Sequence, residues 1–347
     1  MTDKDFCCSS FLALRYIEKP GVDFTDRFRY RLPALPSDEG RILVKTAEDI
    51  NESIENQIKD KVKGYKKVGI FLSGGMDSGI LASYLPGIDA YTFRFLGGSF
   101  QQDELKRAEM IAEKNNMKLH YVDIDWSTVT DYLKPVMISK GGPVHSIELQ
   151  LCKGAVQAKA DGVDLMIIGD ASDYIFGGMD KLLSQDWSFD AFVQRYIYVD
   201  PFEVLKNPVS VRYLFERYRK GDSIDFVEIL DKLAGQESYG SYDNAFVTAG
   251  LDYFDPYEKL KMAEPLDLKR IRSGESKYMI RELYKIRYPD IPVPEKTPMP
   301  RPVDSYFADW KGPTRPEFKD SIEIGNYDGN QRWLLWCLEQ FLNLMDE

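Results

Sequence analysis

The sequence predicts an α/β fold with a doubly wound parallel sheet and a mainly helical C-terminal part. Between residues 68 and 168, short apolar runs typical of buried strands alternate with segments of helical spacing. This alternation favours strands that run parallel, with helices on both faces of the sheet. From about residue 181 to 250 the strand pattern stops and Tyr and Phe are dense. Such an aromatic series is more typical of a helical core than of a ligand pocket.

The first part of the chain, residues 1–45, is expected to be irregular, because prolines and a glycine interrupt it near its end. Thr46 followed by Asp49 predicts the start of a helix. One apolar stripe follows at four-residue spacing, which indicates a helix packed on the sheet. The stripe consists of Ile50, Ile54, Ile58 and Val62.

The remaining elements follow from the same patterns. We expect strands over residues 68–72, 90–95, 118–124 and 163–168. We expect helices over residues 80–85, 103–115, 146–160, 275–283 and 333–345. Six prolines between positions 289 and 302 exclude a helix there and indicate a rigid loop that contains Lys296. We divide the chain into an N-terminal segment (1–45), an α/β domain (46–180) and a mainly helical region (181–347).

Bulk composition limits the classes of function. The 347 residues are 44% hydrophobic and carry a net charge of −11, which argues against broad nucleic-acid binding. The four cysteines include the adjacent pair Cys7 and Cys8 and show no metal-binding spacing or disulfide framework. A reduced, cytoplasmic location is therefore expected. No apolar run reaches the roughly 18 residues of a membrane span, and the N-terminus lacks a signal-peptide pattern.

The first candidate site is the loop Ser73–Ser78, which follows an apolar strand and precedes a helix. Unpaired backbone N–H groups at such a junction attract anions. Gly74 and Gly75 allow φ > 0 and a close approach to a phosphate. Ser73 and Ser78 can add hydroxyl donors, and Asp77 can hold a hard cation such as Mg²⁺. A tight turn with glycines needed only for packing is the alternative; the loop is not a Walker A motif.

The second candidate site is the loop 169–178, which follows the strand over residues 163–168. Its acids Asp170 and Asp173 stand three apart and can face one cation. They could equally be acids that cap the next helix. Both loops end strands of one parallel sheet, where ligands of such folds bind. Asp77 should therefore lie on a strand end next to the second loop.

The Ser-Gly-Gly-x-Asp-Ser string resembles the pyrophosphate loop of the N-type ATP pyrophosphatases, a PP-loop superfamily with an adenine nucleotide alpha hydrolase-like fold. More narrowly, residues 169–178 resemble the Gly-Glu-Gly-Ser-Asp-Glu-x-Phe-Gly-Gly signature of the asparagine synthetase family, in its synthetase domain. Asp103-Glu104, the strand at His120, the stretch 276–281 and the Trp-rich last helix are also similar to that domain. The resemblance covers most of residues 25–347 and is weakest over 181–250.

The resemblance implies roles for particular residues. ATP would contact Leu72, Ser73, Gly74, Gly75 and Ser78, with Phe95 and Gly169 on the adenine and ribose side. Asp77 and Asp173 would hold Mg²⁺ on the pyrophosphate, Lys296 would stabilise charge on the transferring phosphate, and Asp170 would handle the incoming amine.

These roles amount to an AMP-forming carbon–nitrogen ligase. A carboxylate substrate attacks the α-phosphate of ATP and pyrophosphate leaves; ammonia or another amine then displaces AMP and forms an amide. Fixed donors and cations stabilise the charge that develops on the phosphates. An acid near the amine can take its proton. ATP and Mg²⁺ are thus the expected cofactors.

The chain also departs from the family. Thr2 follows Met1 where glutamine-dependent members have a Cys nucleophile, and no glutaminase domain fits. Ammonia is then free or comes from a separate amidotransferase partner, or another amine attacks. Ser146 lies in the segment where asparagine synthetases carry an aspartate-gripping arginine, so aspartate is not implied. His145, in that segment, is a candidate for substrate contact, whereas His120 is expected to be a packed or hydrogen-bonded core residue.

Two other interpretations stay open. One is a PP-loop enzyme that adenylates a nucleobase or other acceptor for sulfur or nitrogen insertion, which usually brings catalytic cysteines or a basic RNA-binding region. The other is a nucleotide-binding regulator without turnover, against which the combination of Asp77, Asp173 and Lys296 argues.

Overall fold

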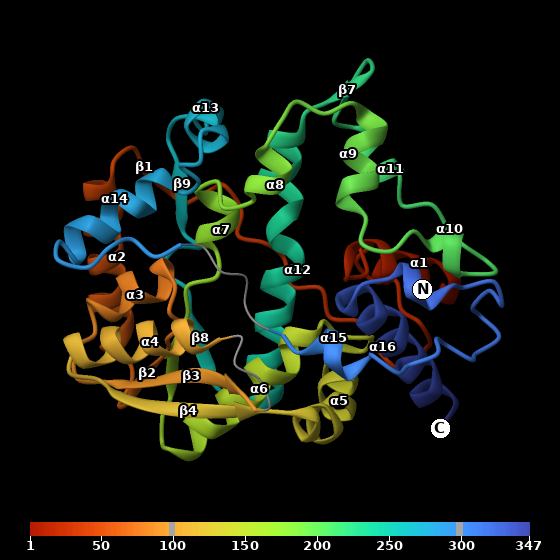
Figure 1. Ribbon diagram of the computed structural model, residues 1–347, viewed down its shortest axis with the longest axis horizontal. Coiled ribbons are helices and arrows are strands. Elements are labelled where there is room, and N and C mark those ends of the chain that lie inside the picture. Colours follow the sequence, from red (N-terminus) through yellow and green to blue (C-terminus); the bar gives the residue numbers. More distant parts are fainter. Residues whose placement is uncertain (97–100, 296–300) are drawn as a thin grey trace.

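The computed structural model describes residues 1–96, 101–295 and 301–347. It has a parallel sheet at one side, the long helix α12 through the middle, and the N- and C-terminal helices together at the other side (Figure 1). In spatial order the sheet contains β4 (Lys118–Ile124), β3 (Asp89–Phe95), β2 (Val68–Phe71), β5 (Leu165–Ile167) and β8 (Asp252–Phe254). All four pairings are parallel, which confirms the predicted fold class.

The strand order makes the sheet doubly wound. From β2 the chain adds β3 and β4 on one side, and later β5 and β8 on the other. The order therefore reverses between β2 and β5, the place where open α/β sheets bind ligands. The four predicted strands are confirmed to within a few residues at their ends. The fifth strand, β8, was not predicted.

Helices cover both faces of the sheet. The helices between residues 47 and 175 are α2 (Ala47–Val62), α3 (Met76–Ala82), α4 (Gln102–Lys114), α5 (Trp126–Lys140), α6 (Ser146–Ala160) and α7 (Ser172–Ile175). Successive residues of β2 point to opposite faces. Ile70 packs in a core with α2, α3, α4 and α14 (Tyr278–Arg287), whereas Phe71 packs in another with α6, α12 (Phe226–Ala249) and α16 (Gly329–Asp346).

Local sequence explains several helix boundaries. Thr46 caps α2 as predicted: its Oγ1 accepts from the N–H of Asp49, and Asp49 Oδ2 accepts from the N–H of Thr46, both at 3.1 Å. The predicted helix over 146–160 coincides with α6. Helix α5 was not predicted, because Pro135 interrupts its pattern.

The expectation of an irregular N-terminal segment is wrong for its first part. Residues Lys4–Leu14 form α1, in which nine of the eleven residues are buried. This helix packs beside α16, and its polar serines are buried together with its apolar residues. A stripe of helical period is therefore absent, although the helix lies in the core. Farther on, β1 (Ile42–Val44) pairs in parallel with β9 (Leu260–Met262).

The region after residue 180 is mainly helical, as predicted. Besides α12, α14 and α16 it contains α8 (Asp180–Leu183), α9 (Phe189–Tyr196), α10 (Pro201–Val204), α11 (Tyr213–Glu216), α13 (Leu268–Arg272), α15 (Val303–Tyr306) and a 3-10 turn (Ile324–Asn326). A short hairpin, β6 (Arg219–Lys220) with β7 (Ser223–Ile224), interrupts it. The described part of the proline-rich stretch, 288–295 and 301–302, contains neither helix nor strand. No helix within the described residues is both long and apolar enough to cross a bilayer.

Candidate functional site

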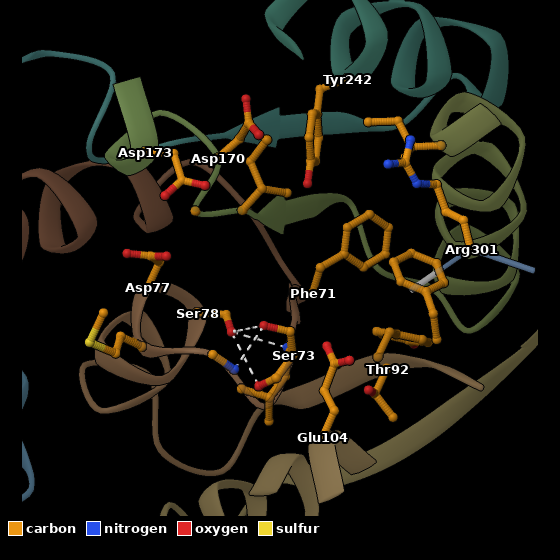
Figure 2. A pocket seen from close by; sticks show the side chains of 18 of the residues that line it. Phe71, Ser73, Asp77, Ser78, Thr92, Glu104, Asp170, Asp173, Tyr242 and Arg301 are labelled. Carbon is orange, nitrogen blue, oxygen red and sulfur yellow. Dashed lines mark hydrogen bonds between the residues drawn. The ribbon is translucent and has the colours of Figure 1, made fainter. Parts of the chain in front are cut away.

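A pocket of about 320 Å³ opens where the carboxyl ends of β2 and β5 meet. Figure 2 shows Asp77 and Asp173 at one end, Arg301 at the other, and Phe71 between them. Most of the residues that the sequence singled out line it. They are Leu72, Ser73, Gly75, Asp77, Ser78, Phe95, Gly169, Asp170, Asp173 and His145.

The loop after β2 is held by its two serines. Ser78 Oγ accepts from the N–H of Ser73 at 3.0 Å, and the two hydroxyl oxygens are 2.9 Å apart (Figure 2). Ser73 Oγ in turn accepts from the N–H of Gly75 at 3.1 Å. In this structure the hydroxyl groups therefore shape the loop itself, and their contact with a phosphate stays a prediction.

Gly74 has a packing role against α4. Neither Gly74 nor Gly75 has positive φ. A Cβ added at Gly74 would stand 2.4 Å from the carbonyl oxygen of Glu104 and 3.0 Å from Arg107 Cβ. Glycine is thus required at position 74, where the loop contacts α4. Neither glycine uses the left-handed backbone that it allows, and their close approach to a phosphate stays a prediction.

The two predicted strand ends meet, and a lysine joins them. Asp77 Oδ1 accepts from Ser172 Oγ of the second loop at 2.6 Å. Lys277 Nζ lies 2.6 Å from Asp77 Oδ1 and 3.0 Å from Asp173 Oδ1. The Lys277 side chain is 2% exposed, compared with 23% for Asp77 and 43% for Asp173. An ammonium group therefore lies buried behind two carboxylates that face the pocket.

Lys277 is a functional candidate that the sequence did not reveal as such. It precedes α14 with left-handed backbone, φ +56°, which is uncommon for a residue with a side chain. Burial opposes its charge, but Asp77 and Asp173 outweigh that effect and raise its pKa. The sequence placed Lys277 only within a helix motif. Its contacts join residues 104 and 200 positions away, so spacing carried no signal.

Asp77 and Asp173 are carboxylates of the kind that could hold a divalent ion bound to phosphate. Mg²⁺ in phosphate sites usually takes one or two protein carboxylates together with phosphate oxygens. Asp77 and Asp173 supply two carboxylates at one edge of the sheet, next to the start of α3. The described residues contain no group of three or more His, Cys, Asp or Glu side chains that could hold a metal ion.

Asp170 lies deeper, on the α12 side of the pocket. Its Oδ1 accepts from Ser238 Oγ at 2.7 Å, and its N–H donates to Asp255 Oδ2 at 2.8 Å. Burial, together with the nearby carboxylates of Asp255, Asp173 and Glu237, raises the pKa of Asp170 well above its usual value. Asp170 therefore keeps its proton to a higher pH than an ordinary aspartate.

Two further predicted residues form the wall. Phe95 is 3% exposed at the end of β3. Gly169 follows the end of β5, and a Cβ there would stand 3.1 Å from Leu81 Cδ1 and 3.3 Å from Tyr257 Cε2. Lys296 lies outside the described residues. His120 is a hydrogen-bonded residue as predicted, with Nε2 2.7 Å from Asp89 Oδ1 and its ring stacked on Tyr91.

The other end of the pocket gathers cations. His145 Nε2 lies 2.7 Å from Arg15 Nη1 and 2.8 Å from Arg301 Nη1. Arg15 also contacts Glu237, with 3.3 Å between Nη2 and Oε2. The sequence indicates His145 but carries no signal for the two arginines, which lie 286 positions apart in the chain.

A parallel α/β sheet with a serine–glycine loop and facing acids at its switch point defines a class of proteins whose site can hold a phosphate chain. Residues 49–241 match the model of one family, asparagine synthase, over more than half of the chain. This chain belongs to the asparagine synthase family.

The match to an individual protein of known name is distant. The chain is 26% identical over 141 residues to a Methanocaldococcus jannaschii protein provisionally named asparagine synthetase [glutamine-hydrolyzing] 1. That match covers 38% of this chain and 25% of the relative, so the chain spans about a quarter of the relative's length.

Solved structures give weak matches. NMN synthetase from Francisella tularensis has a TM-score of 0.30 and 12% identity over 74% of this chain and 100% of that chain. The NH3-dependent NAD synthetase from Campylobacter jejuni has a TM-score of 0.30 and 13% identity over 56% of this chain and 96% of that chain. Similarity at this level says nothing about the activity of this chain.

Proposed function

We propose that this protein is an ATP-dependent ligase that activates a carboxylate as an acyl-adenylate and then forms an amide. Pyrophosphate leaves in the first step; ammonia or another amine displaces AMP in the second. The observation that carries the proposal is the contact of Lys277 with both Asp77 and Asp173 beside the Ser73–Ser78 loop. Membership of the asparagine synthase family supports it.

The first step requires that the triphosphate be gripped while its α-phosphate is attacked. The start of α3, which forms the second half of the Ser73–Ser78 loop, is suited to the β- and γ-phosphates, since the first N–H groups of a helix have no partner within it. The N–H groups of Ser73 and Gly75 already bond the loop's own hydroxyl groups. Leu72 and Ser78 complete that loop. Phe95 and Gly169 offer an apolar face to the adenine and ribose.

Charge develops on the phosphates as pyrophosphate leaves, and fixed cations lower the energy of that state. Lys277 is held in place by two carboxylates, so it needs no reorganisation. Asp77 and Asp173 would hold Mg²⁺, which when bound neutralises phosphate charge. Lys296 is proposed as a second cation on the basis of the family resemblance alone.

The second step releases a proton from the amine. Asp170 is the proposed acceptor in its ionised form, since it lies in the pocket and its raised pKa makes that carboxylate a stronger base than an exposed aspartate. Free ammonia, ammonia from a separate amidotransferase or another amine would supply the nitrogen. From the cysteine content we also propose a cytoplasmic location. From the sequence pattern we propose that the domains of the chain divide at residues 45 and 180.

The test is carboxylate-dependent exchange of pyrophosphate into ATP, measured over a panel of acids, with AMP as the nucleotide product. Asp77→Asn should lower exchange by about 100-fold or more, because a fixed charge at the phosphates is lost. Asp60→Asn is the matched control, since Asp60 is an exposed residue of α2 with 80% of its side chain accessible. Formation of ADP, or ATP binding without AMP release for every acid, would overturn the proposal.

A further inference from the structure

The pocket end opposite Asp77 and Asp173 has more hydrogen-bond donors than the protein satisfies. Arg15 and Arg301 both direct Nη1 at His145 Nε2, and one imidazole nitrogen has a single lone pair. Arg301 also reaches Ser146 Oγ at 3.3 Å, through the same Nη1. Within the described residues, Nε of Arg15 is buried and has no hydrogen-bond partner. Arg15 Nη2 is already engaged by the Tyr198 hydroxyl and Glu237. Arg301 bonds other described residues through Nη1, so its Nε and Nη2 have no acceptor among the described residues and are available to a ligand.

The arginines are fixed in place by different parts of the fold. Arg15 follows α1 with left-handed backbone, φ +68°, and its guanidinium stacks on the ring of Tyr198 at 3.6 Å. Arg301 precedes Pro302, the N-cap residue of α15. His145 is 5% exposed and caps α6, where its N–H donates to Glu148 Oε1 at 2.8 Å. These positions are held before any ligand binds, which favours specific recognition.

The charges at this end do not balance. Glu237 is the carboxylate in contact, 3.3 Å from Arg15 Nη2 and 3.2 Å from His145 Nδ1. His145 is neutral, since burial and the adjacent arginines lower its pKa well below the usual value. Burial and Arg15 also lower the pKa of Arg301. Two cations therefore face one anion, and an arriving anion would relieve their repulsion.

Other charged groups packed against this end compensate one another. Behind His145, the buried Lys140 is 2.5 Å from Glu148, and Asn244 Nδ2 donates to the other carboxylate oxygen at 2.8 Å. Asp328 acts on Arg301 from a greater distance and is already engaged as the cap of α16, where it accepts from the N–H of Gln331 at 2.9 Å. The net positive charge stays at the two arginines.

We infer that Arg15 and Arg301 form a subsite for a second carboxylate of the substrate, one that has no ammonium group beside it. Arginine forks match a carboxylate with paired hydrogen bonds. A single net positive charge complements a lone carboxylate, whereas the carboxylate and ammonium of an amino acid together are neutral. The inference rests on the proposed function: one carboxylate is adenylated near Asp77 and the other is held at Arg301. The substrate class is then a dicarboxylic acid without an α-amino group.

The experiment measures binding by calorimetry on the whole protein, without need of turnover. Malonate, succinate, glutarate and adipate are compared with butyrate, aspartate and inorganic phosphate. At least one dicarboxylate should bind about tenfold or more tightly than butyrate or aspartate. Arg301→Met should remove that preference, and Arg15→Lys should weaken it, since lysine keeps the charge but loses the fork. Arg195→Met is the matched control, as Arg195 is an exposed residue of α9.

The outcomes separate this inference from the proposed function. Equal binding of butyrate and the dicarboxylates, tighter binding of aspartate or phosphate, or a preference that survives Arg301→Met would overturn the subsite. Circular dichroism verifies that the Arg301→Met protein is folded. If the Arg301→Met protein is unstable, Arg15→Lys tests the subsite in its place. Dicarboxylate binding without pyrophosphate exchange would leave the subsite in place and overturn the ligase proposal instead.

Discussion

Lys277 Nζ and Asp77 Oδ1 are 2.6 Å apart, which ties the start of α14 to the start of α3 across 200 positions of sequence. Lys277 also reaches Asp173, so one buried ammonium fixes acids from both strand-end loops. This arrangement keeps two like charges close together at the pocket without a metal. It also sets the orientation of both carboxylates before a substrate arrives.

Replacing Lys277 should therefore affect catalysis more than folding. For Lys277→Met we expect pyrophosphate exchange to fall by about 100- to 1000-fold, since a fixed cation near the phosphates is lost. Stability should fall by about 1–3 kcal/mol, because the carboxylates lose a partner but remain partly in water. Exchange assays and urea unfolding measure the two effects. Lys285→Met, on the exposed face of α14, should change neither, and equal losses in both variants would contradict the assignment.

Asp170 should make the fold less stable as the pH rises. Its folded-state pKa is raised, so above the unfolded value of about 3.9 the native state keeps a proton that the unfolded chain has lost. The free energy of unfolding then falls with pH up to the raised pKa. Asp170→Asn removes this cost, and its melting temperature should exceed that of the unmodified protein at pH 7 but not near pH 4. Pyrophosphate exchange should persist while amide formation drops by about 100-fold or more.

A matched variant at Asp164 should change the melting temperature at pH 7 in the opposite direction. Asp164 accepts from the N–H groups of Lys66 and Lys67, both at 2.9 Å, and these bonds lower its pKa. The contribution of Asp164 to the free energy of unfolding is present above its unfolded-state pKa and is lost as the pH falls through its folded-state pKa. Asp164→Asn should therefore destabilise the protein at pH 7, with the difference fading in acid. A melting temperature that fell for both variants at pH 7 would contradict the account of Asp170.

Much of the sheet and part of the site follow from local sequence. The strands β2 and β5 were visible as buried apolar runs and β4 by its alternation, whereas the fifth strand, Asp252–Phe254, is neither fully buried nor part of such a pattern. The approach of Asp77 to the second loop was also predictable, because parallel strands end at one edge. The parts that were missed depend on tertiary contacts. Helix α1 has no apolar stripe, since its serines are buried with its phenylalanines.

The end of the pocket that holds Arg15 and Arg301 could not be predicted from local sequence. Arg15 and Arg301 come from opposite ends of the chain, and neither stands in a motif. Only the packing of α1 against α16 and the backbone before α15 bring them to His145. The sequence shows that Ser146 cannot make a bidentate contact with a carboxylate, but it does not show which side chains could do so instead.

Ser78 should matter for nucleotide affinity through the shape of its loop. Its Oγ accepts the N–H of Ser73 and bonds the Ser73 hydroxyl, so Ser78→Ala leaves that N–H without its acceptor. A loss of about 1–1.5 kcal/mol is expected, which is roughly a tenfold weaker binding of ATP. Calorimetric titration with MgATP measures it. Ser83→Ala is the control: Ser83 ends α3 and bonds the carbonyl of Ile80, away from the loop. Unchanged affinity in Ser78→Ala would show that the loop keeps its shape without this hydroxyl.

Gly74 tests whether the loop depends on its contact with α4. A Cβ at this position would stand 2.4 Å from the backbone oxygen of Glu104, and backbone cannot yield as a side-chain tip can. Gly74→Ala should therefore push the loop away from α4, cost about 1–3 kcal/mol of stability and weaken ATP binding. Gly64→Ala is the control, because its Cβ would meet only the Lys61 oxygen at 3.9 Å. That variant should be neutral or slightly more stable, since alanine restricts the unfolded chain. Urea unfolding of both variants, with calorimetry on the folded proteins, measures the contrast. A Gly74→Ala protein as stable as Gly64→Ala, with unchanged ATP affinity, would mean that the loop can move away from α4 at no cost.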